Sequence, residues 1–202
     1  GNGTSSRRIR IQNRDYTVGV FVQCNYGRRG RLEVAGVPVG QEIPDLLPCK
    51  VPLPDGSYGN PDREAAPCGA DAGTPQEEVG SIIVVIATDA PLLPTQLKRV
   101  ARRAALGIGR MGGIGGNGSG DIFIAFSTAN ASAAADSGLA SAVFIPNDAL
   151  NPVFEATVDA TSEAILNAML AADTMTGADG YRVYGLPKDR LMAALRKYGR
   201  VK

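Results

Sequence analysis

The sequence places a serine directly after a glycine at the start of its most apolar segment. Ser81 follows Gly80 and opens the run Ser-Ile-Ile-Val-Val-Ile-Ala-Thr, which a polar stretch with Gly and Pro (69–78) precedes. A hydroxyl at this junction could attack the Gly80 carbonyl, and an N-to-O acyl shift followed by hydrolysis would cut the chain there. Ser81 would then carry a hydroxyl nucleophile and an α-amine, whose pKa of about 7.7–8.0 suits a base near neutral pH.

The alternative interpretation of this junction is structural. Turn residues commonly bound buried strands, so Ser81 can be an ordinary polar first residue of a core strand. Glycine suits the cleavage hypothesis, because it tolerates strained backbone angles and leaves its carbonyl accessible. The residue types at the junction leave both interpretations open.

A second hydroxyl and a carboxylate stand at the start of another apolar run. Ser119 and Asp121 bracket Gly120 directly before Ile-Phe-Ile-Ala-Phe-Ser (122–127). Side chains two residues apart project to the same side of an extended chain, so we expect these two groups to lie together. They would also meet Ser81 if the two strands are neighbours. Ser-Gly-Asp is equally a common turn sequence.

Asn25 lies where a strand is predicted to end, in the segment Cys-Asn-Tyr-Gly. A side-chain amide at such a position could direct its N–H groups at a ligand. Asparagine is also typical of turns, and spacing alone favours that structural interpretation.

Composition excludes several kinds of site. The chain of 202 residues contains no histidine, so it holds neither a Ser-His-Asp or Cys-His triad nor the usual His-bearing zinc sites. Its three cysteines lack zinc-ligand spacing; Cys49 and Cys68 flank one loop and could pair or remain free thiols. Residues 107–112 match G-x-G-x-x-G, but a predicted helix precedes them, which argues against a dinucleotide site.

Charge and hydropathy give no general case for a nucleic-acid or membrane partner. The formal net charge is +1 and tryptophan is absent. No apolar run approaches the ~20 residues of a membrane span. Four basic residues of a predicted helix are expected to form its solvated face: Lys98, Arg99, Arg102 and Arg103.

The elements expected to position these groups are short strands and three helices. Alternation of polar and apolar residues predicts a hairpin of two strands, 8–12 and 16–25. The Ile/Val-rich runs predict strands buried on both faces at 82–86 and 122–127. Apolar residues spaced three and four apart predict helices at 91–109, 151–174 and 188–198. Brief apolar runs predict further strands at 32–34, 143–146 and 181–184. Residues 41–79 show no period and predict an irregular loop.

Taken together, these segments resemble the DmpA/BapA family of autoprocessed serine aminopeptidases, which comprises L-aminopeptidase/D-esterases and β-aminopeptidases. The matching stretches follow in the same order along most of the chain: 3–7, 22–27, 36–40, 80–92, 97–110 and 118–122.

The resemblance implies an α+β fold, a four-layer αββα sandwich similar to that of N-terminal-nucleophile hydrolases but differently connected. It also implies that residues 1–202 are one domain of a longer precursor. Residues 1–80 would be the C-terminal part of a large subunit, and 81–202 a small subunit formed by cleavage between Gly80 and Ser81.

The resemblance further implies the roles of individual residues. Ser81 would be the nucleophile, Ser119 and Asp121 its assisting and orienting partners, and Asn25 an oxyanion-hole donor. The substrate would be a short peptide, amino-acid amide or ester, with no metal or organic cofactor, in a homo-oligomer that includes the rest of the large subunit. The chain departs from the family in having Asp121 where some members have Glu, and in a longer loop at 45–79.

Two other hypotheses keep the same scaffold. One is an acyltransferase resembling ornithine acetyltransferase, which would pass the acyl group to an amine. That family characteristically has threonine as its nucleophile, so Ser81 argues against it. The other is a non-catalytic relative that retains the fold and leaves the bond between Gly80 and Ser81 intact.

Overall fold

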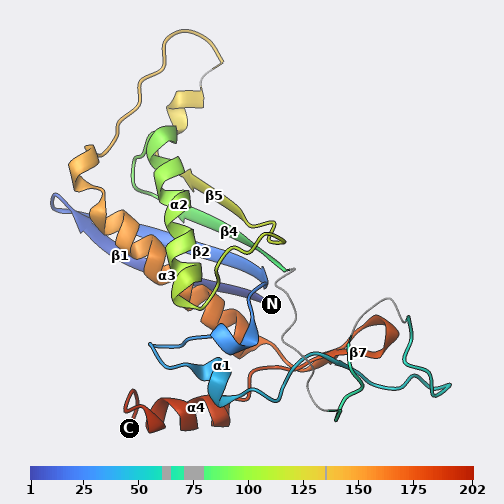
Figure 1. Cartoon of the computed structure of the whole chain (residues 1–202). Helices are drawn as coiled ribbons and strands as arrows, with labels where there is room; N and C mark the ends of the chain where they lie inside the picture. Colours follow the sequence, from blue (N-terminus) through green and yellow to red (C-terminus); the bar gives the residue numbers. More distant parts are fainter. Residues whose placement is uncertain (61–64, 71–79, 135) are drawn as a thin grey trace.

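A four-stranded sheet forms the centre of the computed structural model, which describes residues 1–60, 65–70, 80–134 and 136–202. The strand order is β1-β2-β4-β5 (Figure 1). The bounds are β1 (Asn2–Ile11), β2 (Arg14–Asn25), β4 (Ser81–Thr88) and β5 (Ile122–Ser127). β2 runs antiparallel to both β1 and β4, whereas β5 runs parallel to β4. The predicted hairpin and both apolar strands are therefore present, and the two apolar strands are neighbours.

Two long helices cover one face of this sheet (Figure 1). α2 (Pro94–Arg110) connects β4 to β5, and α3 (Asn151–Ala171) packs on β1, β2 and α2. Both confirm predicted helices, with ends shifted by a few residues. The core between the sheet and the helices is aliphatic, and its fully buried strand residues include Val18, Val22, Ile82, Val84 and Ile86. Within the basic run, Arg99 and Arg103 lie over the Phe154 ring, so that run is only partly solvated.

The opposite face of the sheet is open, which corrects the prediction that β4 and β5 are buried on both faces. Burial alternates along both strands. Five large apolar side chains on the open face are 36–51 % exposed: Phe21, Ile83, Ile122, Ile124 and Phe126. An Ile/Val run predicts that both faces are apolar, but it cannot predict whether the same chain supplies both covers.

Two of the predicted short strands are absent. At 32–34, Ala35 and Gly36 have φ of 52° and 72°, so Val34 and Val37 form an isolated bridge across a tight turn. At 143–146, the backbone N–H and carbonyl of Val143 are taken by the Asn130 side chain, which leaves no pairing for a neighbouring strand.

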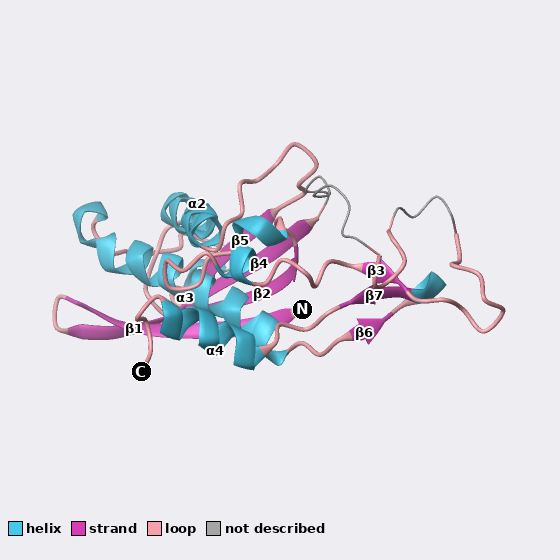
Figure 2. Ribbon diagram, turned by 60° about the horizontal axis from the view of Figure 1, so that its bottom comes forward, coloured by secondary structure: helices cyan, strands magenta, loops and turns pink. Residues whose placement is uncertain are grey.

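A small second sheet lies beside the main one (Figure 2). Its order is β3-β7-β6, from β3 (Cys49–Lys50), β6 (Met175–Thr176) and β7 (Tyr181–Val183). Of these, β7 confirms the strand predicted at 181–184. α1 (Val39–Glu42) packs against α4 (Lys188–Lys197), the last predicted helix. Residues 61–64 and 71–79 of the predicted irregular loop lie outside the described residues. In the part of the chain that is described, no helix is long and apolar enough to cross a bilayer.

Candidate active site

The junction between Gly80 and Ser81 lies against the end of β2. Ser81 is the first residue of β4 and stands directly opposite Asn25 in the antiparallel register. Gly80 packs so closely that a Cβ there would lie 1.9 Å from the Asn25 carbonyl oxygen. Only glycine permits this approach of two backbones. The predicted scissile bond and the predicted oxyanion donor are therefore adjacent.

Asp121 binds the backbone of the residue that follows Ser81. Its Oδ1 accepts the Ile82 N–H at 3.1 Å and the Ser119 hydroxyl at 2.5 Å. The second contact confirms that Ser119 and Asp121 lie together. The first extends the parallel pairing of β4 and β5, which begins at Ile83 and Ile122, back toward the nucleophile. Asp121 thus anchors the start of β4.

The Ser81 hydroxyl is held by a backbone group. The Gly120 N–H donates to Ser81 Oγ at 3.1 Å. By strand alternation, Ser81 projects to the open face of the sheet together with Ile83. The three predicted side chains thus lie at two neighbouring strand starts, which backbone amides connect. We call the two contacts between these starts, Gly120 to Ser81 and Ile82 to Asp121, the clamp. In the hydrogen bonds between described residues, the Ser119 hydroxyl donates to Asp121, and Asp121 also accepts from the Ile82 N–H. The Ser81 hydroxyl oxygen accepts from the Gly120 N–H.

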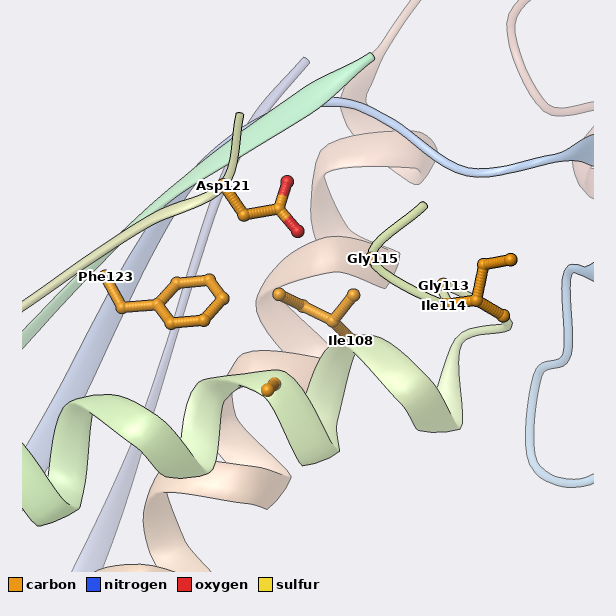
Figure 3. A pocket seen from close by; sticks show the side chains of 7 residues that line it. Ile108, Gly113, Ile114, Gly115, Asp121 and Phe123 are labelled. Atoms are coloured by element: carbon orange, nitrogen blue, oxygen red, sulfur yellow. The ribbon is translucent and has the colours of Figure 1, made fainter. Parts of the chain in front are cut away.

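A hollow of about 150 Å³ lies on the helix side of this clamp. The Asp121 carboxylate points into it, between the side chains of Ile108 and Phe123, and the glycine-rich turn of Gly113 and Gly115 forms its rim (Figure 3). Asp121 Oδ1 therefore accepts the hydrogen bonds from Ile82 and Ser119, while the carboxylate as a whole borders an apolar, partly open space.

One thiol, that of Cys24, is adjacent to Asn25 in the sequence. Burial raises the pKa of the Cys24 thiol to about 11, so this neighbour of Asn25 stays protonated at neutral pH. Among the described residues, no three His, Cys, Asp or Glu side chains come together as a metal site.

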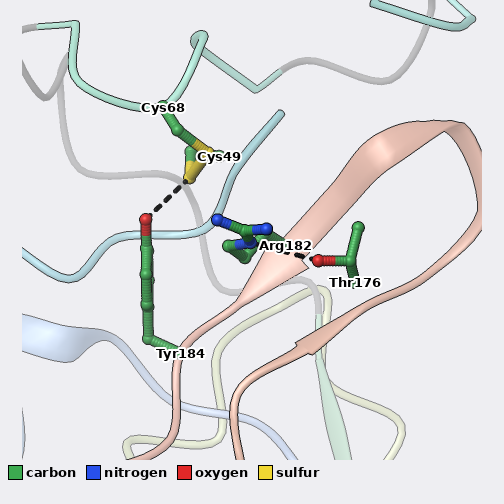
Figure 4. The surroundings of a disulfide bond; sticks show 5 residues. All are labelled: Cys49, Cys68, Thr176, Arg182 and Tyr184. Atoms are coloured by element: carbon green, nitrogen blue, oxygen red, sulfur yellow. Dashed lines mark hydrogen bonds between the residues drawn. A yellow bond between two sulfur atoms is a disulfide. The ribbon is translucent and has the colours of Figure 1, made fainter. Parts of the chain in front are cut away.

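Cys49 and Cys68 form a disulfide, which decides between the two alternatives left open by the sequence. The bond ties β3 to the segment that leads toward Ser81, and the Tyr184 hydroxyl lies 3.4 Å from Cys49 Sγ (Figure 4). On the neighbouring strand, Arg182 donates to Thr176 at 3.1 Å. These contacts stabilise the small sheet at one end of the loop.

Two contributors to the site were missed from the sequence: the Gly120 N–H and the Ile82 N–H. Backbone amides carry no residue-type signal, and Gly120 was noted only as the residue between Ser119 and Asp121. The one clue was a glycine between a hydroxyl and a carboxylate, two residues before β5, and a turn explained that glycine equally well.

Comparison with known proteins decides the family, because residues 1–183 match peptidase family S58. The chain belongs to peptidase family S58. The beta-peptidyl aminopeptidase BapA of Sphingosinicella microcystinivorans is 50 % identical over 202 residues, which are 100 % of this chain and 48 % of that protein. BapA of Sphingosinicella xenopeptidilytica is 42 % identical over 198 residues, 97 % of this chain and 46 % of that protein. The S58 chain thus spans about half the length of these relatives.

A solved structure confirms the fold class. The L-aminopeptidase D-Ala-esterase/amidase of Ochrobactrum anthropi, described as a prototype of the serine aminopeptidases and a variant of the Ntn-hydrolase fold, matches with a TM-score of 0.79. It is 42 % identical, and the match covers 100 % of this chain and 49 % of that one. The resemblance to DmpA/BapA and the α+β sandwich of N-terminal-nucleophile type are both confirmed.

Proposed function

We propose that this S58 chain carries the nucleophile of a self-cleaving serine aminopeptidase. The observation that supports this most is the environment of Ser81: its hydroxyl meets the Gly120 N–H at 3.1 Å, and Asp121 holds the next residue, Ile82, at 3.1 Å. A hydroxyl fixed at a strand start, directly after a closely packed Gly80, supports attack on the preceding carbonyl.

The cleavage step follows from these contacts. Ser81 Oγ bonds to the Gly80 carbonyl carbon, its proton passes to the Ser81 nitrogen, and the C–N bond breaks to leave an ester. Water then hydrolyses this ester, which gives a carboxylate at Gly80 and a free α-amine at Ser81. The products are a large subunit that ends at Gly80 and a small subunit that begins at Ser81.

Turnover uses the same oxygen on an external substrate. The neutral α-amine takes the Ser81 hydroxyl proton as Oγ attacks the substrate carbonyl, then gives that proton to the leaving amine. Water hydrolyses the resulting acyl-enzyme and releases the N-terminal residue. Asn25, opposite Ser81 in the sheet, donates to the oxyanion. The substrates are short peptides, amides or esters with a free N-terminus, and the names of the BapA relatives favour β-amino acids among them.

The open face of the sheet belongs to the same proposal. Its exposed apolar residues, Phe21, Ile83, Ile122, Ile124 and Phe126, are typical of a covered surface. We propose that the remainder of the large subunit supplies the second sheet of the sandwich there. The assembled enzyme is a homo-oligomer, which sedimentation of the full-length protein would reveal.

Denaturing mass spectrometry of the full-length protein tests the proposal. We expect a fragment that begins at Ser81, and we expect Ser81→Ala to abolish both this fragment and the hydrolysis of aminoacyl amides and β-peptides. Ser132→Ala, at an exposed position far along the chain, should process normally. An unprocessed wild-type protein, or unchanged processing in Ser81→Ala, would contradict the proposal. Transfer of the acyl group to an added amine in preference to water would indicate an acyltransferase.

A further inference from the structure

The residue type at position 120 is not explained by backbone conformation or by packing. Gly120 is not among the glycines with positive φ, so a left-handed backbone does not explain the glycine there. A Cβ added there would meet just two heavy atoms within 4 Å, apart from its chain neighbours: Ser81 Oγ at 3.1 Å and Ser81 Cβ at 4.0 Å. Among the described residues, therefore, Ser81 is the one that a methyl group at this position would meet.

The amide of the same residue is directed at the same atom. The Gly120 N–H donates to Ser81 Oγ at 3.1 Å. Asp121, the next residue, accepts the Ile82 N–H at 3.1 Å, so two consecutive residues of one strand start bind two consecutive residues of the other. This pair of contacts fixes the direction of the Gly120 N–H relative to the nucleophile and leaves little freedom for either group to turn away.

We propose that Gly120 is a catalytic residue: its N–H stabilises the charge that develops on Ser81 Oγ, and its missing side chain keeps that oxygen open to the carbonyl under attack. The inference rests on the proposed function, in which Ser81 is the nucleophile. A hydrogen bond to an ionised oxygen is roughly twice as strong as one to a neutral oxygen, so the N–H favours the state in which the hydroxyl proton has left. The chain has no histidine, so the proposed base is the α-amine of Ser81. The Gly120 N–H helps this base by stabilising the oxygen from which the amine takes the proton.

Two variants of the full-length protein separate the two parts of the proposal. Glycolic acid in place of Gly120, introduced by nonsense suppression, removes the N–H and adds no bulk. We expect kcat for an aminoacyl amide to fall by about 10²-fold, as on loss of one preorganised donor, with KM unchanged. The matched control is glycolic acid in place of Gly112, which removes an N–H that donates to the Gly109 carbonyl in the same glycine-rich segment. This control should keep the wild-type kcat.

Gly120→Ala keeps the N–H and places a methyl group 3.1 Å from Ser81 Oγ. We expect it to lose both self-cleavage and turnover while its thermal midpoint stays near that of the wild type. Gly109→Ala, whose methyl group would meet nothing within 4 Å, should cleave and turn over normally. If the ester protein does not fold, the alanine variant carries the test.

The outcomes distinguish this inference from the proposed function. Wild-type turnover in a folded Gly120 variant of either kind overturns the role of Gly120, while Ser81→Ala remains inactive. Activity that survives in Ser81→Ala removes the nucleophile and, with it, both proposals. An equal loss in the Gly112 ester would show that the effect is a general one of loop structure, and would also overturn the inference.

Discussion

Asp121 contacts the nucleophile's strand through the backbone, because its Oδ1 accepts the Ile82 N–H at 3.1 Å. The same oxygen accepts the Ser119 hydroxyl at 2.5 Å. An amide oxygen can accept both hydrogen bonds, whereas a methyl group can accept neither. The acidic residue therefore acts as a positioning residue in the structure as it stands.

This geometry predicts different results for two substitutions of Asp121. Asp121→Asn should keep self-cleavage and lose less in kcat than the about 10²–10⁴-fold that removal of a general base costs. Asp121→Ala should lose cleavage and about 1–3 kcal/mol of unfolding free energy, because two part-buried donors are left without an acceptor. Urea titration and steady-state kinetics measure both. A full loss of kcat in Asp121→Asn at unchanged stability would assign the carboxylate a proton-transfer role instead.

Asn25 gives a prediction for the oxyanion. It stands opposite Ser81, and the antiparallel register places the Cβ atoms of such a pair about 4.5–5.5 Å apart. Asn25→Ala should lower kcat by about 10²–10³-fold, the usual cost of one oxyanion donor, and should leave KM nearly unchanged. Gln23→Ala is the matched control, since Gln23 is exposed two residues earlier on the same strand and the same face. Equal effects in the two variants would count against an oxyanion role for Asn25.

The sequence was sufficient for the hairpin and the three helices, because each has a clear period in its apolar residues, and for the two apolar strands, because each is a short unbroken apolar run. It also placed Ser119 beside Asp121, since spacing of two along an extended chain determines a shared side. It could not show that Ile83 and Phe126 are exposed. The sequence shows that a side chain is apolar, but it does not show whether this chain or another one covers it.

The features that were not predicted from the sequence are the backbone hydrogen-bond donors of the site and the pairing of the two cysteines. The Gly120 N–H could be found only from coordinates, because every residue except proline has such a group. The pairing of Cys49 with Cys68 depends on how residues between them close the loop, which the spacing alone leaves open. The Val143 segment failed as a strand for a related reason: the Asn130 side chain occupies its backbone groups.

Helix packing yields a prediction from two glycines on α2. A Cβ at Gly107 would lie 2.7 Å from Thr161 Cβ and 2.8 Å from the Val158 carbonyl oxygen, so α2 and α3 approach through this residue. Gly107→Ala should therefore lower the free energy of unfolding by about 1–3 kcal/mol despite the better helix propensity of alanine. Gly109→Ala has open space and should raise it by up to about 1 kcal/mol. Urea midpoints of the two variants should move in opposite directions, and a shared direction would contradict the packing argument.

The disulfide predicts a local loss of stability. Cys49 and Cys68 are 19 positions apart, and loop-closure entropy assigns a cross-link of that span about 3 kcal/mol. Replacing both residues by alanine should speed amide exchange at Lys50, whose N–H donates to the Ala66 carbonyl, and leave exchange at Val84 in the main sheet unchanged. Cys24→Ala is the control that keeps the bridge. Faster exchange at Val84 would mean that the small sheet and the main sheet unfold as one unit.

Cys24 provides a prediction about pH. Burial raises its thiol pKa from 9.0 to about 11, so the folded chain favours the neutral thiol. The stability that this preference contributes is fully present below pH 9.0 and is lost as the pH rises through about 11. With the disulfide intact, Cys24 is the one thiol available to iodoacetamide. The alkylation rate should titrate near pH 11 in the folded protein and near 9 in urea, and Cys24→Ala should lessen the alkaline loss of stability. A folded-state midpoint near 9 would show that the thiol is solvated.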